Sequence, residues 1–159
     1  MTQITQQKVR EFLSYEPDTG LFRYRKGKRA GKVAGHQHHG YVKISLPSHG
    51  GIYAHRLAWL YMTGALPIKH VDHIDCERNN NAWANLRLAR PDQNQANTRR
   101  TKRNISGAKG VFQHRGCFRA VIQVKGRRIY LGDYNTLQEA AAAYAGAARV
   151  GFGEFARVA

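Results

Sequence analysis

The chain has 159 residues and carries 26 Lys and Arg against 10 Asp and Glu, which gives a formal charge of +16. This length allows one domain or two small ones, and a hydrophobic share of 42% permits a folded core. Such a charge favours nucleic acid as the partner, because each Lys or Arg that meets a phosphate releases condensed counterions. An anionic membrane is the alternative, but the sequence has no basic amphipathic helix and no apolar run near the roughly 20 residues of a membrane span.

The two cysteines, Cys76 and Cys117, lie far apart in the sequence. A disulfide framework and a zinc site built from cysteine pairs are therefore not expected. The N-terminal residues MTQITQQKVREF lack the apolar core of a signal peptide. These features predict a cytoplasmic protein. Nothing in the sequence indicates an oligomer interface, and the oligomeric state stays open.

Turn signals and short apolar segments alternate in the N-terminal third. A turn is predicted at residues 17–20 (PDTG), followed by a short strand at 21–25 and a basic, glycine-containing loop. The segment YVKISL, residues 41–46, alternates with a period of two and predicts another strand. IYAHRLAWLYMTG then has apolar residues at helical spacing, and Gly64 is the predicted end of this helix.

Two short extended segments are predicted around Val71 and at residues 86–88, with a polar, asparagine-rich loop between them. A short helix is expected to begin near Pro91, since proline suits the first position of a helix. The basic segment RRTKRNIS, residues 99–106, follows as a linker. It is either a solvated tether or a tether that also contacts phosphate.

Strands are predicted more clearly beyond residue 107. FRAVIQV and RIYLG alternate and are joined by a glycine turn, which predicts an antiparallel pair with one exposed face. The residues expected on the exposed face are Arg119, Val121, Gln123, Lys125, Arg128 and Tyr130. The residues expected on the core face are Phe118, Ala120, Ile122, Val124, Ile129 and Leu131.

An alanine-rich helix is predicted after this strand pair. Thr136 and Glu139 form the capping-box pattern that begins a helix, and Gly151 is the predicted end. Alanine-rich sequence propagates a helix, and its small side chains allow close packing on a sheet. The predicted packing stripe comprises Ala140, Ala143, Tyr144 and Ala147.

The few acidic residues are concentrated around one histidine. Asp72, Asp75 and Glu77 lie within six residues, whereas no acid occurs between Asp18 and Asp72. Cleavage of a phosphodiester requires a nucleophile, charge neutralisation and a stabilised leaving oxygen, which one divalent metal and a general base can supply. Hard cations prefer oxygen ligands, and neutral histidine is the natural base near pH 7. Asp72 followed by His73 offers a ligand and a base on opposite sides of an extended backbone, so the acids would hold a metal and the basic residues a polyanion.

Purely structural roles for these residues are the alternative to a metal site. A single Asp-His pair is commonly a surface turn, but Asn85 and Asn94 supply further polar groups downstream. His55 is expected to be a structural histidine whose hydrogen bonds are satisfied. The HQHH segment, residues 36–39, is expected to be a loop near phosphate rather than a metal site. Turn shaping or helix capping is expected for the remaining acids of this region, Asp75, Glu77 and Asp92.

The segment HVDHIDCERNNNAWANLRLARPDQNQAN resembles the HNH endonuclease motif of phage and intron-encoded homing endonucleases, and YAHRLAWLYMTGALP is similar to the segment that precedes it. The resemblance implies a β-hairpin and a helix around one divalent metal ion, Mg²⁺ or alternatively Mn²⁺. It implies Asp72 and Asn94 as metal ligands and His73 as the general base. It also implies that Asn85 holds the hairpin loop and orients His73. Asn94 stands where the family name has a histidine, which implies a modest affinity for the metal.

Residues 107–155 resemble the AP2 DNA-binding domain, and YLGDYNTLQEAAAAY is the most specific part. The resemblance implies a three-stranded antiparallel sheet on one helix, with the exposed face of the sheet in the DNA major groove. Phe112 and Val121 depart from the family pattern, so no target bases are predicted. An exposed basic sheet without specificity is the alternative. The residues expected to face DNA, from the resemblance or the strand alternation, are Lys109, His114, Arg119, Gln123, Lys125, Arg128 and Tyr130.

The predicted fold class is therefore α+β, a ββα-metal HNH nuclease core followed by a small AP2-like sheet and helix. The predicted organisation is a basic, DNA-contacting region at 1–52, the HNH domain at 53–98, the linker at 99–106 and the AP2-like domain at 107–159. The expected function is site-selective cleavage of double-stranded DNA to 5′-phosphate and 3′-hydroxyl ends, with no small-molecule cofactor. The alternative is a non-catalytic DNA-binding regulator, and an RNA partner ranks lower because few exposed aromatic residues are suited to stacking.

Overall fold

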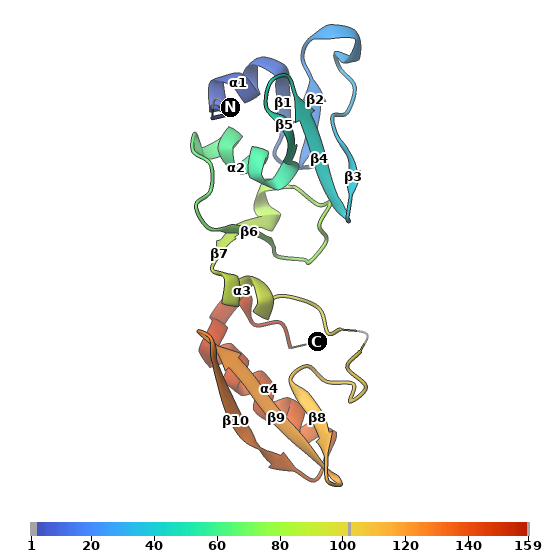
Figure 1. The fold of residues 1–159 in the computed structure, drawn as a ribbon, viewed down its shortest axis with the longest axis vertical. Coiled ribbons are helices and arrows are strands. Elements are labelled where there is room, and N and C mark those ends of the chain that lie inside the picture. The colour runs from blue at the N-terminus through green and yellow to red at the C-terminus, as the bar shows by residue number, and fades with distance from the viewer. Residues whose placement is uncertain (1–2, 102, 159) are drawn as a thin grey trace. The chain divides into compact units, whose positions relative to one another are not determined.

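The computed structural model of the protein describes residues 3–101 and 103–158. Its helices and short antiparallel strands form two compact units, with the boundary between Ala89 and Arg90 (Figure 1). This mixture agrees with the predicted α+β class. Within the described residues, no helix is both long and apolar enough to cross a membrane. Lys102 of the predicted linker lies outside the described residues.

The first unit comprises the described residues up to Ala89 and is built from short strands and helices. Strand β1 pairs with β2, strands β3, β4 and β5 form a second sheet in that order, and β6 pairs with β7. All of these pairings are antiparallel. The elements are α1 (Gln6–Phe12), β1 (Leu13–Glu16), β2 (Leu21–Tyr24), η1 (Gly27–Arg29), β3 (His36–His38), β4 (Tyr41–Leu46), β5 (Gly50–Tyr53), α2 (Ala54–Thr63), β6 (His70–His73), η2 (Trp83–Asn85) and β7 (Leu86–Ala89).

The predicted turn and strands of the N-terminal third are present. Residues 17–20 form the turn between β1 and β2, and β4 covers the predicted segment 41–46. Leu13 and Tyr15 on β1 alternate with exposed residues, and Phe22 on β2 is buried. The apolar side chains of this strand pair therefore face one core, as strand alternation requires.

Helix α2 connects the N-terminal sheets to the strand pair β6–β7. It ends as predicted at Gly64, which adopts a φ of 83° and donates its amide hydrogen to the carbonyl of Leu60. Leu60 belongs to one hydrophobic cluster with Ile44 of β4, Val71 of β6 and Leu86 of β7. The N-terminal sheets and the strand pair β6–β7 therefore share a core, while the functional boundaries expected at residues 52 and 98 stay predictions.

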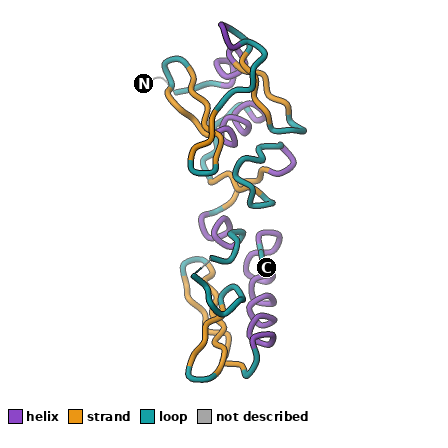
Figure 2. Tube along the Cα trace, turned by 90° about the vertical axis from the view of Figure 1, so that its right-hand side faces the viewer, coloured by secondary structure: helices purple, strands orange, loops and turns teal. Residues whose placement is uncertain are grey.

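The second unit is a three-stranded antiparallel sheet with a helix along it. Strand β9 lies between β8 and β10, and α4 packs against all three strands (Figures 1 and 2). Thr136 and Glu139 form the predicted capping box at the start of α4. The elements are α3 (Pro91–Ala96), β8 (Val111–His114), β9 (Cys117–Val124), β10 (Arg127–Tyr134), α4 (Leu137–Phe152) and η3 (Gly153–Phe155).

Details of the packing in this unit differ from the prediction. Helix α4 continues past Gly151 to Phe152 and is capped by Gly153. A Cβ at position 151 would lie 3.0 Å from Cγ2 of Val124, so this glycine permits close packing on β9 instead of ending the helix. The buried stripe of α4 comprises Ala140, Tyr144, Ala148 and Phe152, at intervals of four residues.

Ile129 was expected in the core and is 44% exposed, so that prediction is wrong. It lies opposite the buried Ile122, but it is on the edge strand β10 near the turn that ends the hairpin. Side chains at the end of an edge strand are more exposed to solvent than those of the central strand. The alternation of residues along one strand does not reveal this difference.

Substitution of Gly20 tests how closely the β1–β2 turn packs on the segment around Asn81. Gly20 has a φ of 73°, and a Cβ there would overlap the backbone of Asn81 and Ala82. Gly27 has a similar φ of 75°, but a Cβ there would meet no atom within 4 Å. We predict that Gly20→Ala lowers the free energy of unfolding by about 3 kcal/mol or more, and Gly27→Ala by about 1 kcal/mol. Urea denaturation measures both, and equal losses would contradict the close approach.

Candidate active site and nucleic-acid interface

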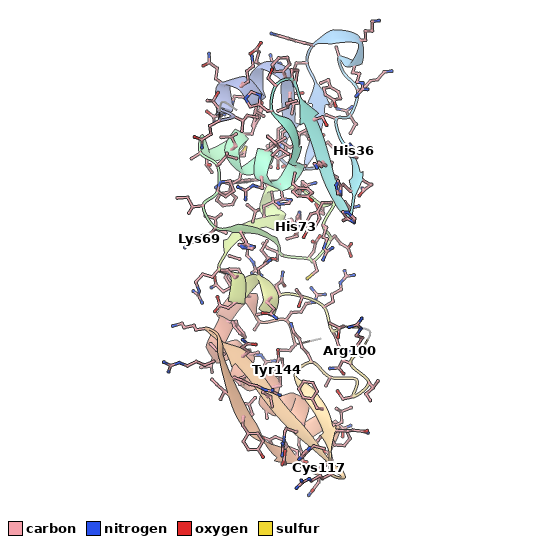
Figure 3. The ribbon with its side chains drawn as sticks, viewed as in Figure 1. His36, Lys69, His73, Arg100, Cys117 and Tyr144 are labelled. Atoms are coloured by element: carbon pink, nitrogen blue, oxygen red, sulfur yellow. The ribbon has the colours of Figure 1, made fainter. Side chains whose placement is uncertain are left out.

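Strand β6 carries Asp72 and His73 of the predicted catalytic cluster, and His73 is labelled in Figure 3. Asp72 lies directly opposite Arg87, and His73 lies directly opposite Leu86. Consecutive strand residues project to opposite faces, so the Asp72 carboxylate and the His73 imidazole leave β6 on different sides. Both residues are 5% exposed, so both faces of the strand pair are covered at this point.

His73 is held by Asn81. Nε2 of His73 lies 3.2 Å from Oδ1 of Asn81, and Nδ2 of Asn81 donates to the carbonyl of Asn79 at 3.0 Å. The second bond fixes the orientation of the Asn81 amide, so Nε2 of His73 carries the hydrogen and Nδ1 is the basic nitrogen. Burial lowers the pKa of His73, although the Asn81 bond and the charges of Asp75 and Asp72 oppose this shift. The imidazole is therefore neutral at neutral pH, as a general base must be.

Asp72 forms an ion pair with Arg87 across the strand pair. Nε of Arg87 donates to Oδ2 of Asp72 at 3.0 Å, and the side chains of Arg87 and Asp72 are 12% and 7% exposed. A carboxylate at this depth is costly without a counter-charge, and the guanidinium supplies one. The pair fixes the proposed metal ligand on its strand.

The loop between β6 and β7 is organised by Asn85 and Asp75. Nδ2 of Asn85 donates to Oδ1 of Asp75 and to the carbonyl of Asn80, both at 2.9 Å, and Oδ1 of Asn85 accepts from the Asp75 amide at 3.0 Å. Burial raises the pKa of Asp75, but hydrogen bonds from the Glu77 amide, Asn80 and Asn85 outweigh it and leave this pKa below its usual value. These bonds support the predicted role of Asn85 in holding the loop, and its orientation of His73 stays a prediction.

Asn94 lies on α3, in the second unit. The backbone amide of Asn94 donates to the carbonyl of Arg90 at 2.9 Å, and the residue is partly buried. The helix begins with Pro91, as predicted, and the backbone amide of Arg90 donates to Oε1 of Gln93 at 2.9 Å. Asp72 belongs to the first unit, and the binding of one ion by Asp72 and Asn94 together stays a prediction.

Aromatic rings pack against one side of His73. His55 of α2 contacts its ring edge to face at a centroid distance of 5.2 Å, and the ring of Tyr41 on β4 lies 6.1 Å away. Tyr53 stacks on His55 with an interplanar angle of 12°. His55 is buried, and its Nδ1 has no hydrogen-bond partner among the described residues. His55 therefore packs directly on the proposed base, and the prediction that its hydrogen bonds are satisfied is wrong for Nδ1 among the described residues.

The HQHH segment was predicted to be a loop, but it forms strand β3 and the first residue of the turn that follows, so the loop prediction is wrong. His36 and His39 are exposed, and Nη1 of Arg78 donates to the carbonyl of His39 at 3.4 Å. The Arg78 guanidinium lies 5.0 Å from the ring centroid of Tyr41. Among the described residues, no group of three or more His, Cys, Asp or Glu side chains is arranged to hold a metal. The phosphate contact expected for this segment stays a prediction, and Arg78 adds a positive charge beside it.

The exposed face of the β9–β10 pair carries several residues expected to meet DNA. Gln123 lies opposite Arg128, and Arg119, Arg128 and Tyr130 line a common depression of the surface. Arg119 donates through Nε and Nη2 to both carboxylate oxygens of Asp133 at 2.8 Å, and its guanidinium lies 5.3 Å from the ring centroid of Tyr130. The fork of Arg119 is therefore held in a defined orientation on this face.

The other residues expected to meet DNA lie at the ends of these strands. Lys125 is exposed in the two-residue turn between β9 and β10, and His114 is the last residue of β8. Lys109 precedes β8, and its ammonium group donates to the carbonyls of Ala96 and Thr98. Contact of all three with phosphate or bases stays a prediction.

The sequence reasoning missed residues that contact the proposed catalytic groups directly. Arg87 could have been found, because pairing the two predicted strands in antiparallel register brings an arginine opposite the acid. Asn81 was one asparagine among several in a polar loop, and only the conformation of the loop shows that it bonds to His73. Tyr41 was assigned only to a strand, and its approach to His73 depends on the packing of β4.

Comparison with known proteins bears on the segment that contains Asp72 and His73. Residues 52–96 match the family model described as HNH endonuclease. This segment of the chain is therefore similar to HNH endonuclease domains. Protein 3.8 of Escherichia phage T7 is 35% identical over 77 residues, which cover 46% of this chain and 64% of that protein. The uncharacterized HNH endonuclease L560 of Acanthamoeba polyphaga mimivirus is 34% identical over 109 residues, 67% of this chain and 57% of that protein.

The chain thus spans less than two thirds of the length of either relative. No solved structure matches. The HNH match includes β6, β7 and α3, and therefore contains Asp72, His73, Asn85 and Asn94. Nuclease activity, metal dependence and the nature of the products belong to the proposal below.

His55 makes the stability of the first unit sensitive to acid. Burial, together with the charges of His73 and Arg56, lowers its pKa to about 3. The unfolded chain binds a proton at His55 below pH 6.5 and the folded chain does not, so this residue removes about 2 kcal/mol of stability between pH 8 and pH 5. We predict that His55→Phe reduces the loss of stability over this interval by about that amount, measured by urea denaturation at both pH values.

His49→Phe serves as the control, because His49 is partly exposed and bonds locally to the Pro47 carbonyl. This variant reports the effect of replacing a histidine with phenylalanine outside the core of the first unit. An unchanged pH dependence in His55→Phe would contradict the assignment.

Proposed function

We propose that the protein is a metal-dependent, site-selective DNA endonuclease of the homing type, which hydrolyses phosphodiester bonds to 5′-phosphate and 3′-hydroxyl ends. The observation that carries the proposal is a buried, neutral His73 beside Asp72 on one strand of the segment that matches the HNH endonuclease family. A neutral imidazole next to a carboxylate is the arrangement that a hydrolytic site with a divalent ion uses.

The residues fit a hard divalent ion, Mg²⁺ or alternatively Mn²⁺. Asp72 offers a carboxylate and Asn94 an amide oxygen, the ligand types that such ions prefer, and the ordinary remaining ligands are water and a substrate phosphate. The side chain of Asp72 is paired with the guanidinium of Arg87, which fixes the oxygen donor in place. When bound, such an ion would neutralise charge on the phosphate and stabilise the leaving oxygen.

His73 performs the proton transfer in this proposal. Its Nδ1 accepts a proton from the attacking water, while Nε2 keeps its bond to Asn81 and so holds the ring in one tautomer. Asn85 and Asp75 hold the loop that carries Asn81. Burial favours the neutral imidazole before the reaction, and the neighbouring carboxylates stabilise the imidazolium that forms.

Recognition of DNA is proposed for the exposed face of the β8–β10 sheet, in the manner of the AP2 domain that the sequence resembles. A two-stranded ribbon fits the major groove, where arginine pairs with guanine and glutamine with adenine. Arg119, Gln123 and Arg128 stand on the exposed face of β9 and β10. The formal charge of +16 supplies the less specific attraction to phosphate, to which residues 1–52 also contribute.

A DNA-binding regulator without catalysis is the second candidate. The positive charge and the arginine-bearing sheet face favour it, because binding alone would account for both. Activity on DNA separates the candidates, since a regulator leaves supercoiled plasmid intact whatever metal is supplied.

We predict that the full-length protein relaxes or linearises supercoiled plasmid in Mg²⁺ or Mn²⁺ and not in EDTA. His73→Ala should lower the rate by about a hundredfold or more, because a general base contributes 10²–10⁴-fold, and should bind DNA about as tightly as the unsubstituted protein. His70→Ala is the matched control, since His70 is exposed on the same strand. Intact plasmid under every metal would favour the regulator, and full activity of His73→Ala would refute the assigned base.

A further inference from the structure

Arg87 stands out because its ion pair with Asp72 is largely withdrawn from solvent. The Lys26–Glu11 pair of the same unit has a similar distance of 3.1 Å, but its side chains are 58% and 38% exposed, against 12% and 7% for Arg87 and Asp72. An exposed pair is screened by water and constrains its members little. A pair at the depth of Arg87 and Asp72 is screened much less by water and constrains both side chains more strongly.

The register of the hairpin favours this contact. Asp72 and Arg87 are directly opposed in the antiparallel β6–β7 pair, so their side chains emerge side by side on the same face. The Nε–H of Arg87 points to Oδ2 of Asp72 at 3.0 Å. The pairing of the two strands therefore keeps Arg87 within reach of this carboxylate, and in the structure the two side chains are bonded.

We propose that Arg87 is a positioning residue for Asp72, which holds the carboxylate ready for the divalent ion and keeps the affinity for that ion low in the DNA-free protein. The inference rests on the proposed function, because it assigns Asp72 to the metal. An ion bound by Asp72 would share one carboxylate with a guanidinium, and two positive charges a few ångströms apart repel each other strongly where water is scarce.

Substrate DNA would relieve this repulsion. A phosphate brings negative charge and can accept hydrogen bonds from the guanidinium as well as bind the ion. Binding of the ion and of DNA would then strengthen each other, since any coupling between two ligands is reciprocal. The presence of Asn94 in place of histidine already implies a modest affinity for the metal, and Arg87 would be a second cause of it. The metal would then bind chiefly when DNA is bound.

The test is the affinity of the full-length, DNA-free protein for Mg²⁺, measured by isothermal titration calorimetry at constant ionic strength. Arg87→Gln should bind Mg²⁺ about tenfold more tightly than the unsubstituted protein, or tighter still, because it removes the competing charge. A residue that only supports the fold would weaken binding or leave it unchanged when replaced. Equal or weaker binding by Arg87→Gln would therefore overturn the proposal.

Two further variants separate charge from structure. Lys26→Gln removes one positive charge from the exposed pair of the same unit, and it should bind Mg²⁺ as the unsubstituted protein does. Arg87→Lys keeps the charge at the site but not the planar fork, so its affinity should stay within about threefold of the original. A gain in Lys26→Gln as large as in Arg87→Gln would show a general charge effect and overturn the proposal.

Arg87→Gln leaves Asp72 without its buried partner and could unfold in the absence of metal. In that case circular dichroism during the Mg²⁺ titration is the measurement. Recovery of the folded spectrum supports the proposal, since the ion then replaces the lost charge, and failure to recover at concentrations that saturate the unsubstituted protein overturns it.

Plasmid cleavage and Mg²⁺ binding test different claims. Cleavage by the unsubstituted protein without a gain in affinity for Arg87→Gln would refute only the role of Arg87. Intact plasmid together with tighter Mg²⁺ binding by Arg87→Gln would refute the nuclease and leave the control of ion binding at Asp72 in place.

Discussion

The antiparallel register of β6 and β7 is the constraint on which the proposed site depends. It sets Asp72 beside Arg87 and sends His73 to the other face of the strand. A shift by one residue would exchange the faces of every side chain on β6 and separate the carboxylate from its counter-charge. The register is secured by Val71 and Leu86, which belong to the core of the first unit, and by the hydrogen bonds of Asn85 to the connecting loop. Packing and polar bonding thus favour the same pairing.

Burial gives the two neighbouring side chains of β6 different chemical properties. Asp72 is compensated by an arginine and so remains an ionised oxygen donor. His73 is buried beside the rings of His55 and Tyr41, and this burial favours an uncharged imidazole, although the hydrogen bond to Asn81 opposes it. A ligand for a cation and an acceptor for a proton can therefore coexist on adjacent residues without forming an ion pair with each other. The N-terminal sheets contribute to this, because Tyr41 comes from β4.

The sequence predicted the elements that have strong local signals. The turn at 17–20, the helix that ends at Gly64 and the capping box of Thr136 all follow from local residue chemistry, and the structure contains them. Features set by tertiary packing were harder to predict from the sequence. Ile129 alternates like a core residue but lies near the end of an edge strand. The hydrogen bond of Asn81 to His73 depends on the fold of a polar loop whose asparagines look equivalent in sequence.

The central claim is that Asp72 and Asn94 bind the same divalent ion. Crystals of the full-length protein soaked in Mn²⁺, with data collected at the manganese absorption edge, locate such an ion directly. The account predicts one anomalous peak bonded to a carboxylate oxygen of Asp72 and to the amide oxygen of Asn94, at about 2.2 Å from each. A manganese ion bound by only one of these residues, or bound elsewhere on the chain with both residues unligated, would contradict it.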